Sequence, residues 1–471
     1  MAYYNDFEKF GAAVAARQAD GQIATYEDLA VFCDNLGAAL PKRTLVFCFC
    51  ENEIGSMFGY LGFLKNRIVP LLLDNHIHKD LADSLIETYR PPYIYAPMSR
   101  EEEFGTCLFS DYGYGLFRTQ YPDEVELFDD LALLLTTSGS TGSPKLVRQS
   151  YTNIQANAES IAEYLKLDET ERPITTLRMN YTYGLSIINS HVLVGAQMLL
   201  TNATLWEKEF WEFFESGEAT SFGGVPYTYE MLKKLRFFRM KTPSLRYMTQ
   251  AGGKLLPELH KEFAEYAAKE GKQFIVMYGQ TEATARMAYL PGDRSLEKYG
   301  SMGIAIPGGK FDLIDVNGDL ITEPDVVGEL VYKGPNVTLG YATEQADLAK
   351  GDERGGVLVT GDMAKMDEEG FFYIVGRKKR FLKIYGNRVN LDETERMVKR
   401  QFEEMDCACS GVDDHMEVYI TSPKAEDREA VEMFLREKTR LQGKAFTVYS
   451  IEKIPKNEAG KTLYKELKPE E

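Results

Sequence analysis

The chain has 471 residues, of which 44% are hydrophobic and 27% are charged, a composition typical of globular proteins. Its length favours two or more domains, because single hydrophobic cores rarely extend beyond about 250–300 residues. The 54 lysines and arginines against 72 aspartates and glutamates give a net charge of −18, which argues against non-specific binding to nucleic acid or anionic membranes. A site for an anionic ligand would therefore need cations concentrated within a motif.

Helix and strand patterns alternate through the first part of the chain. Thr25 and Asp28 form a capping-box pattern at the start of the first predicted helix. Helices are predicted over residues 25–40, 150–165 and 256–271. Strands are predicted over residues 44–50, 92–97 and 273–279. Strands that alternate with helices predict a layered α/β domain.

The pattern changes beyond residue 300. Asn317-Gly318 predicts a hairpin, and residues 371–386 are dense in β-forming side chains. The last ninety or so residues predict a strand, a helix and a strand over 415–423, 425–440 and 446–455. The predicted fold class is α/β, with a large layered domain that includes a β-rich subdomain, residues 1–378, and a small α+β domain, residues 379–471.

The start of the sequence and the spacing of its cysteines bear on the expected compartment. The first residues, MAYYNDFEKFG, contain no apolar signal core, and no run reaches the ~18 apolar residues that would predict membrane insertion. None of the six cysteines forms a C-x-x-C pair, and Cys48 and Cys50 alternate in a strand-like run, so burial is expected. These features predict a protein of the reducing cytoplasm.

The stretch LALLLTTSGSTGSPK, residues 131–145, carries the strongest chemical signal. An apolar strand leads into eight residues of only Thr, Ser and Gly, and Lys145 follows. Gly139 and Gly142 permit conformations in which successive backbone N–H groups form an anion-binding nest. A solvated linker is the alternative, and the spacing differs from the P-loop of NTPases. The stretch predicts a site for phosphates.

Three later stretches contain residue types that suit a nucleotide. YGQTEAT, residues 278–284, follows an apolar strand, at the end where open α/β sheets bind ligands. Asp362 and Arg377 could bind a vicinal diol such as ribose, although a hairpin with solvated charges is the alternative. Lys461 follows Gly460 near the C-terminus, where a charged tail is the alternative.

In this order, the stretches resemble the adenylate-forming superfamily of AMP-forming acyl-CoA and aryl-CoA ligases, carrier-protein adenylation domains and firefly luciferases. The resembling segments are TTSGSTGSPK, YGQTE, TGD, GRKKRFLKIYG and PKNEAGK, with weaker matches that include AGGKLLP and GELVYKGPNVTLGY. The resemblance runs from about residue 25 to the end. It implies ATP, Mg²⁺ and CoA, or a carrier protein's phosphopantetheine, as cofactors, and a small-molecule carboxylic acid as substrate.

The same resemblance implies roles for individual residues. The phosphates of ATP would contact Thr137, Ser138, Gly139, Ser140, Thr141, Gly142 and Lys145. Adenosine would contact Gly252, Gly253, Tyr278 and Gly279, with the ribose at Asp362 and Arg377. The catalytic set would be Thr281, Glu282, Lys383 and Lys461, with Mg²⁺ near Glu282. Lys379 would be the hinge about which a mobile C-terminal domain turns between the two half-reactions.

The acid pocket would be formed by Tyr181, Tyr183, Gly184 and Gly303. Amino-acid-activating members carry an aspartate near the position of Tyr181, and its lack here argues against an amino acid substrate. His191 is expected to be a buried structural residue. Aromatic residues nearby, including Phe222 and Tyr227, suggest an apolar pocket, although aromatic side chains are also common in cores.

Three functional hypotheses follow. The first is an acid–thiol ligase that forms an acyl-adenylate with release of pyrophosphate and then an acyl-CoA. The second is a stand-alone enzyme that loads an acyl carrier protein. The third is a non-catalytic nucleotide-binding homologue, which the presence of both Lys461 and Glu282 argues against. The sequence does not identify the acid.

Overall fold

The computed structural model describes residues 2–40, 43–136, 145–385, 387–402, 404–439, 441, 444–456 and 462–468. The chain forms two compact units, one of Met1–Lys310 and Tyr332–Leu358, the other of Phe311–Val331 and Val359–Glu471. The domain boundary predicted between residues 378 and 379 falls within the second unit and stays a prediction. No helix in these ranges is both long enough and apolar enough to span a membrane.

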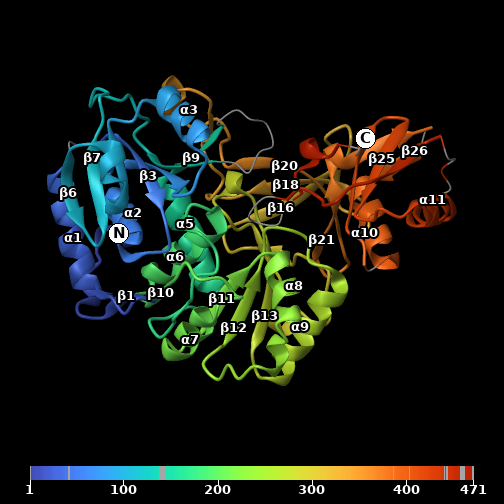
Figure 1. Ribbon diagram of the computed structural model, residues 1–471, viewed down its shortest axis with the longest axis horizontal. Coiled ribbons are helices and arrows are strands. Elements are labelled where there is room, and N and C mark those ends of the chain that lie inside the picture. Colours follow the sequence, from blue (N-terminus) through green and yellow to red (C-terminus); the bar gives the residue numbers. More distant parts are fainter. Residues whose placement is uncertain are drawn as a thin grey trace. The chain divides into compact units, whose positions relative to one another are not determined.

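The first unit contains a large mixed sheet of order β19-β9-β8-β4-β3-β5-β7-β6 (Figure 1). Its central strands β8, β4, β3 and β5 run parallel, and their unbroken apolar runs are buried, as expected for strands covered on both faces. Cys48 and Cys50 are buried here, as predicted. The strands are β3 (Leu45–Cys50), β4 (Val69–Asp74), β5 (Tyr93–Pro97), β6 (Cys107–Asp111), β7 (Tyr114–Arg118), β8 (Leu131–Thr136), β9 (Leu146–Ser150) and β19 (Gly340–Ala342).

Helices pack on this sheet and share its core. The predicted capping box is confirmed, since the Thr25 hydroxyl accepts from the Asp28 N–H at 3.1 Å and the Asp28 carboxylate accepts from the Thr25 N–H at 2.8 Å. A small sheet of order β10-β1-β2 lies in the same unit. These elements are α1 (Tyr26–Ala38), α2 (Ile54–Lys65), α3 (Lys79–Tyr89), α4 (Glu101–Phe104), α5 (Tyr151–Leu165), β1 (Val14–Gln18), β2 (Ile23–Thr25) and β10 (Met198–Leu200).

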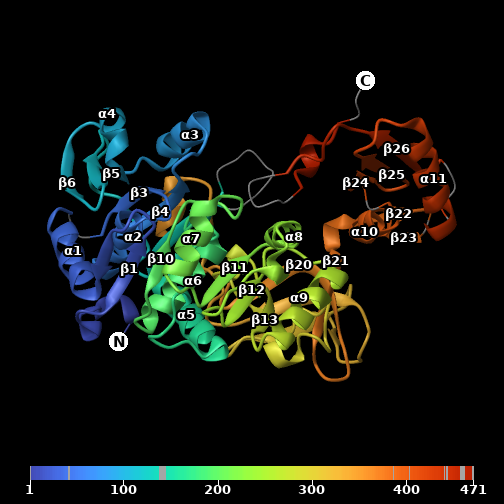
Figure 2. The ribbon, with the colours of Figure 1, turned by 60° about the horizontal axis from the view of Figure 1, so that its bottom comes forward.

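A second sheet of the first unit has the order β11-β12-β13-β14-β15. β11, β12 and β13 are parallel and lie side by side in both ribbon views, with α8 and α9 next to them (Figures 1 and 2). The predicted helix before residue 271 and the strand after it are confirmed as α9 and β13. The elements are α6 (Thr182–Leu193), α7 (Lys208–Ser216), α8 (Pro226–Lys234), α9 (Pro257–Lys269), β11 (Ser221–Gly224), β12 (Tyr247–Gln250), β13 (Gln273–Tyr278), β14 (Ala288–Tyr289) and β15 (Ile304–Ala305).

The second unit begins with a sheet of order β17-β16-β18-β20-β21. The hairpin predicted at Asn317-Gly318 is confirmed, because β16 and β17 pair across it. The segment rich in β-forming residues, residues 371–386, contains β21 and β22, separated by a 3-10 turn, Lys378–Arg380. The strands are β16 (Lys310–Ile314), β17 (Leu320–Ile321), β18 (Gly328–Lys333), β20 (Val357–Met366) and β21 (Phe372–Arg377).

The C-terminal part of this unit has its own hydrophobic core, which begins at Leu382. The predicted strand, helix and strand of this part are confirmed as β25, α11 and β26. Its elements are β22 (Phe381–Ile384), β23 (Asn387–Asn390), β24 (Cys407–Val412), β25 (His415–Ile420), β26 (Phe446–Ser450), α10 (Leu391–Gln401) and α11 (Ala425–Thr439). The mixed α/β fold class predicted from the sequence is therefore confirmed.

Short 3-10 turns connect many of these elements. They are η1 (Tyr3–Asn5), η2 (Glu8–Phe10), η3 (Met98–Arg100), η4 (Phe237–Arg239), η5 (Thr281–Ala283), η6 (Gly292–Arg294), η7 (Gln345–Ala349), η8 (Lys378–Arg380) and η9 (Tyr464–Glu466). Two of them, η5 and η8, carry predicted site residues.

Candidate active site

The carboxyl ends of three parallel strands meet at one edge of the second sheet. Gly224 on β11 pairs with Gln250 on β12, and Gln250 pairs with Val276 on β13. Gly252 and Gly253 lie in the loop that follows β12. Tyr278 is the last residue of β13, and Gly279 follows it. The predicted adenosine-binding residues of the first unit therefore lie at a single edge, the one where open α/β sheets bind ligands.

Two of these glycines leave no room for a side chain. Gly252 has a φ of +83°, and a Cβ there would lie 2.6 Å from the Tyr181 hydroxyl. A Cβ on Gly279 would overlap the backbone carbonyl of Ala285. At these two positions, only backbone atoms can therefore face the neighbouring residues and any ligand bound at this edge.

Glu282 is held in place from both its backbone and its side chain. It lies in the turn η5, and its Oε1 accepts a hydrogen bond from the Tyr341 hydroxyl at 2.7 Å. Its backbone carbonyl accepts from the Thr338 hydroxyl at 2.9 Å and from Arg354 Nη1 at 3.1 Å. Thr281, the preceding residue, is half-buried in the same turn.

Tyr341 links Glu282 to two cations. Lys145 Nζ lies 3.2 Å from the centre of the Tyr341 ring, and the Arg354 guanidinium lies 4.6 Å from it. Burial, and after it the negative charge of Glu282, raise the pKa of Tyr341 to about 12, so the hydroxyl stays protonated and donates to Glu282 at neutral pH. The predicted phosphate-loop lysine and the predicted metal-site glutamate are thus brought together, through a tyrosine to which the sequence analysis gave no role.

The residues around Glu282 fit a magnesium ion. Mg²⁺ is usually bound in proteins through one or two carboxylates together with water and substrate phosphates, so a single positioned glutamate suffices. Within the described ranges, no group of three or more His, Cys, Asp and Glu side chains is arranged to hold a metal. A metal at Glu282 would share its coordination between this carboxylate and the phosphates of a nucleotide, as Mg²⁺ sites commonly do.

Replacing Tyr341 by phenylalanine should slow adenylation about 10-fold or more, because a hydrogen bond to a charged group contributes about 1.5–3 kcal/mol. The substitution keeps the aromatic ring next to Lys145 and removes only the hydrogen bond that orients Glu282. The variant should therefore need a higher Mg²⁺ concentration than wild type to reach half of its maximal rate. Pyrophosphate release measured across a Mg²⁺ titration checks this.

Tyr93 provides a matched control for this variant. Its hydroxyl donates to the Asp123 carboxylate at 2.7 Å, and Arg118 lies 5.0 Å from its ring centre, but it belongs to β5 in the large sheet. Tyr93→Phe should leave the Mg²⁺ dependence unchanged. An identical Mg²⁺ titration for wild type and Tyr341→Phe would contradict the role given to Tyr341.

The predicted ribose residues form an ion pair in the second unit. Asp362 on β20 pairs in register with Arg377 on β21, and the Arg377 Nε lies 3.4 Å from Asp362 Oδ1. The aspartate side chain is buried, whereas the arginine side chain is 56% exposed. The neighbouring strands therefore bring the two residues together, while their contact with ribose stays a prediction.

Asp362→Asn should weaken binding of both ATP and AMP about 10-fold or more, since a charged acceptor for the ribose hydroxyls is lost with little change in shape. Calorimetric titration with each nucleotide measures the effect. Asp325→Asn is the control, because Asp325 pairs with Lys365 on the same strand β20 at 2.6 Å but is well exposed. Equal nucleotide affinities in Asp362→Asn and wild type would exclude the ribose role.

Lys379 lies between two residues that are anchored to different elements. Lys378 Nζ lies 2.7 Å from Glu329 on β18, whereas Arg380 Nε lies 2.8 Å from Asp392 on α10. Neighbouring residues are thus tied to the sheet and to the C-terminal core, which suits a hinge at Lys379. Lys383 is exposed on β22, and both assigned roles stay predictions.

The tyrosines of the predicted acid pocket lie together at the start of α6. Tyr181 is the N-cap residue, and the buried Tyr183 donates from its hydroxyl to the Thr249 carbonyl at 2.8 Å. Their ring centres are 6.4 Å apart. Gly184 lies in the same first turn, whereas Gly303 lies before β15, where its N–H donates to the Ser301 hydroxyl at 2.9 Å.

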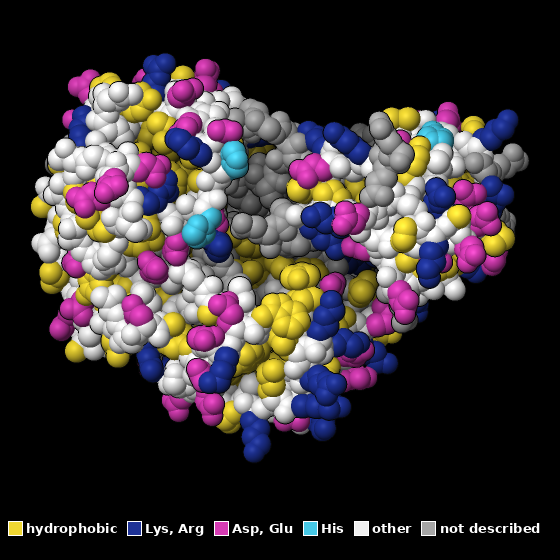
Figure 3. All heavy atoms as spheres, viewed as in Figure 1, with side chains coloured by type: hydrophobic (Ala, Val, Ile, Leu, Met, Phe, Trp, Pro, Cys, Tyr) yellow, Lys and Arg dark blue, Asp and Glu magenta, His cyan; other side chains and the backbone are white. Residues whose placement is uncertain are grey.

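Two aromatic residues considered for this pocket differ in their surroundings. Phe222 is buried in an aromatic cluster that includes Tyr229 and Phe237. Tyr227 is 47% exposed on α8, and Figure 3 shows hydrophobic side chains gathered over that helix. Phe222 thus belongs to the core and also lines a pocket with Thr249 and Arg286, whereas Tyr227 lies at the surface.

His191 is a buried structural residue, as predicted. Its Nδ1 lies 2.8 Å from the Ile187 carbonyl and its Nε2 lies 3.0 Å from the Tyr247 hydroxyl. Burial lowers the pKa of His191 to about 4, with a smaller contribution from the positive charge of Arg286, so the imidazole is neutral at pH 7.

Three residues near the site had no predicted role: Tyr341, Arg354 and Arg286. The segment GELVYKGPNVTLGY was recognised, but the contact of its tyrosine with Glu282 spans 59 positions. Arg286 interrupts an apolar run that follows YGQTE, and a charge in such a run could have indicated a special role. Among the predicted residues, Thr137, Ser138, Gly139, Ser140, Thr141, Gly142 and Lys461 lie outside the described residues.

Comparison with sequence relatives points to ligases. The 2-succinylbenzoate–CoA ligase of Geobacillus kaustophilus (strain HTA426) is 29% identical over 349 residues, covering 72% of this chain and 69% of that protein. The long-chain-fatty-acid–CoA ligase of Bacillus subtilis (strain 168) is 26% identical over 431 residues, covering 89% and 72%.

Solved structures share the fold. The o-succinylbenzoate CoA synthetase MenE from Bacillus subtilis, in complex with the acyl-adenylate intermediate OSB-AMP, superposes with a TM-score of 0.80 at 21% identity, covering 100% of this chain and 98% of that one. ATP-bound MatB from Rhodopseudomonas palustris gives a TM-score of 0.78 at 22% identity, covering 99% and 98%. A family model described as AMP-binding enzyme matches residues 5–342. Since this match spans well over half of the sequence, the chain belongs to the AMP-binding enzyme family of the adenylate-forming superfamily.

Proposed function

We propose that this chain is an AMP-forming acid–thiol ligase that joins a carboxylic acid to CoA. In the first step, a carboxylate oxygen attacks the α-phosphorus of ATP, and the bond to the bridging oxygen breaks to release pyrophosphate. In the second step, the thiol sulfur attacks the acyl carbon, the thiol proton is lost, and AMP leaves. The observation that carries the proposal is the gathering of Gly252, Tyr278, Gly279 and Glu282 at one sheet edge, in a chain of this family.

The first step brings one anion onto another. Two unit charges 4 Å apart repel by roughly 4 kcal/mol at an intermediate dielectric. Lys145 and Arg354, held on the Tyr341 ring, supply positive charge beside Glu282. Bound Mg²⁺ would neutralise phosphate charge, and Glu282, oriented by Tyr341 and Thr338, would be its protein ligand. The protein's contribution is therefore preorganised charge.

CoA is the proposed thiol because the names of the sequence relatives specify CoA ligases. Loading of a carrier protein is the second candidate. The acid is a separate question, since the relatives' names specify 2-succinylbenzoate and long-chain fatty acids, which are chemically unlike.

The test is a pyrophosphate-release assay with ATP, Mg²⁺ and a panel of carboxylic acids, run with CoA, with a phosphopantetheinylated carrier protein, and with neither. We expect pyrophosphate and acyl-adenylate from a preferred acid in all three, and a thioester with CoA. A thioester on the carrier protein alone would favour the second candidate. Tight ATP binding without pyrophosphate release from any acid would indicate a non-catalytic homologue.

A further inference from the structure

Arg286 is a buried cation without a carboxylate partner in the described part of the chain. Its side chain is among the largest that are fully enclosed, with 2% exposure. The guanidinium donates to the Ser186 hydroxyl at 3.2 Å and to the Tyr164 hydroxyl at 3.1 Å, and it contacts the Met277 sulfur. It also lies 4.4 Å from the centre of the Tyr183 ring. All four partners are uncharged.

Burying an unpaired charge is costly, so buried charges are normally paired. Arg148, the other large buried arginine, follows this rule. Its side chain is fully buried, it lies 2.6 Å from the Glu353 carboxylate, and its Nε donates to the Tyr341 carbonyl at 3.1 Å. Arg148 thus has a carboxylate counterion, whereas among the described residues the guanidinium of Arg286 contacts only hydroxyl groups, a thioether and an aromatic ring.

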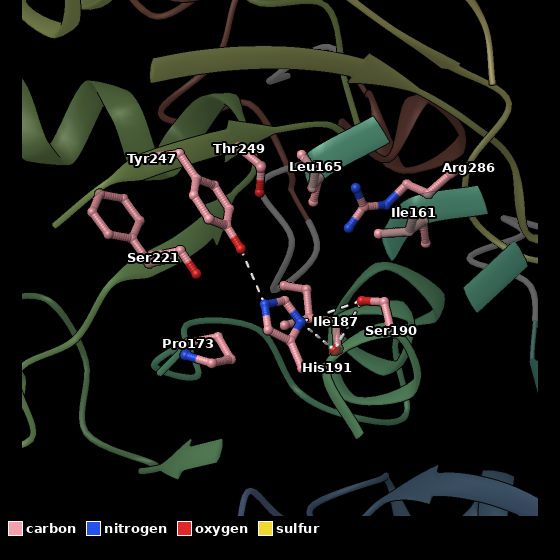
Figure 4. Close-up of a pocket in the computed structure, with 12 residues that line it drawn as sticks. Ile161, Leu165, Pro173, Ile187, Ser190, His191, Ser221, Tyr247, Thr249 and Arg286 are labelled. Carbon is pink, nitrogen blue, oxygen red and sulfur yellow. Dashed lines mark hydrogen bonds between the residues drawn. The ribbon is translucent and has the colours of Figure 1, made fainter. Parts of the chain in front are cut away.

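Arg286 borders a small pocket. Figure 4 shows its guanidinium turned toward the space that Thr249, Leu165 and Ile187 also border. The polar lining consists of hydroxyls and of His191, which is neutral at pH 7 because burial lowers its pKa to about 4. Arg286 is therefore the only charged side chain among the described residues of the lining. The pocket has room for about one water-sized group, and its aliphatic walls have rotatable side chains.

The pocket adjoins the predicted acid site. Arg286 stacks on Tyr183, whose hydroxyl also reaches the Thr249 carbonyl on β12. In sequence, Arg286 follows Glu282 by four residues, after the turn at the carboxyl end of β13. A group bound by Arg286 would thus lie beside Tyr183, and in the proposed reaction it would belong to a part of the substrate other than the reacting carboxylate.

We propose that Arg286 binds a second carboxylate of the substrate, so that the acid activated by this enzyme is a dicarboxylic acid. The inference rests on the proposed ligase function. A carboxylate would supply the missing counterion and accept charge-assisted hydrogen bonds from the guanidinium. A carboxylate is larger than one water, so its entry requires the aliphatic side chains of the lining to rotate. A positive charge in the lining disfavours the end of a long alkyl chain.

The proposal is tested with acids in matched pairs that differ by one carboxylate. Suitable pairs are adipate with hexanoate, and 4-(2-carboxyphenyl)butanoate with 4-phenylbutanoate. Thioester formation with ATP, Mg²⁺ and CoA gives kcat/KM for each acid. Wild type should prefer the dicarboxylate in at least one pair by about 10-fold or more. Arg286→Met, which keeps the volume and removes the charge, should lower that ratio about 100-fold. Preference for the monocarboxylate in every pair, or an unchanged ratio in the variant, would overturn the proposal.

Thermal unfolding gives a second readout. If Arg286 is kept for binding, Arg286→Met should unfold at the same or a higher temperature than wild type, because an unpaired buried charge is removed. A purely structural arginine would predict a lower unfolding temperature and an unchanged substrate ratio. If Arg286→Met fails to fold, Arg286→Lys is the variant to measure, because lysine keeps the charge but lacks the planar guanidinium. It should lower kcat/KM for the dicarboxylate about 10-fold and leave kcat/KM for the monocarboxylate unchanged. Equal changes for both acids would overturn the proposal.

Binding without turnover separates this inference from the proposed function. The dicarboxylate of the preferred pair should raise the unfolding temperature of wild type, and Arg286→Met should lose this shift. If that shift is seen but no acid releases pyrophosphate, the ligase function fails and the Arg286 site stands. If pyrophosphate is released with monocarboxylates alone, the ligase function stands and the Arg286 site fails.

Discussion

Replacing Lys461 by alanine should slow acyl-adenylate formation about 10²–10³-fold, the usual effect of losing one preorganised contact to a charge that develops in the transition state. The resemblance of PKNEAGK to the family's catalytic-lysine motif predicts that this ammonium contacts the α-phosphate and the substrate carboxylate. Given a chemically prepared acyl-adenylate, the variant should still transfer the acyl group to the thiol at near-normal speed. Pyrophosphate release and thioester formation, measured separately, check the two halves of the prediction.

Lys468→Ala is the control for Lys461→Ala, since Lys468 is an exposed lysine close by in the sequence. It should leave both half-reactions at wild-type rates. Equal slowing of both half-reactions by Lys461→Ala would mean that the lysine is not specific to adenylation.

Lys379→Pro should have the opposite effect, sparing pyrophosphate release and slowing thioester formation roughly 10²-fold. Proline fixes φ near −65° and restricts the residue before it, so a backbone position that must leave this range during a rotation is blocked. Lys378 and Arg380 are anchored to Glu329 and Asp392, so a rotation between their partners has to be absorbed close to Lys379.

Lys379→Ala separates the backbone effect from the charge. It removes the ammonium but keeps the freedom of φ, so thioester formation should remain near normal. Should Lys379→Pro form the thioester as fast as wild type, or should Lys379→Ala be equally slow, Lys379 is not the pivot.

The sequence by itself determined most of the secondary structure and the order of the motifs. The Thr25 capping box, the helix α9 and the hairpin at Asn317-Gly318 depend on residues a few positions apart, so local patterns predict them. The α/β class follows from their alternation. Parallel pairing of β11, β12 and β13 then explains why motifs far apart along the chain meet at one edge.

Only the tertiary structure decided how charges are paired. The contacts of Glu282 with Tyr341 and of Arg148 with Glu353 join residues 59 and 205 positions apart, and no local pattern encodes them. The break between β21 and β22 coincides with Lys378 and Arg380, whose partners lie on different elements. In the sequence, Arg286 stands out only as a charge within an apolar run; its significance comes from burial, since an unpaired charge is costly only where packing excludes water.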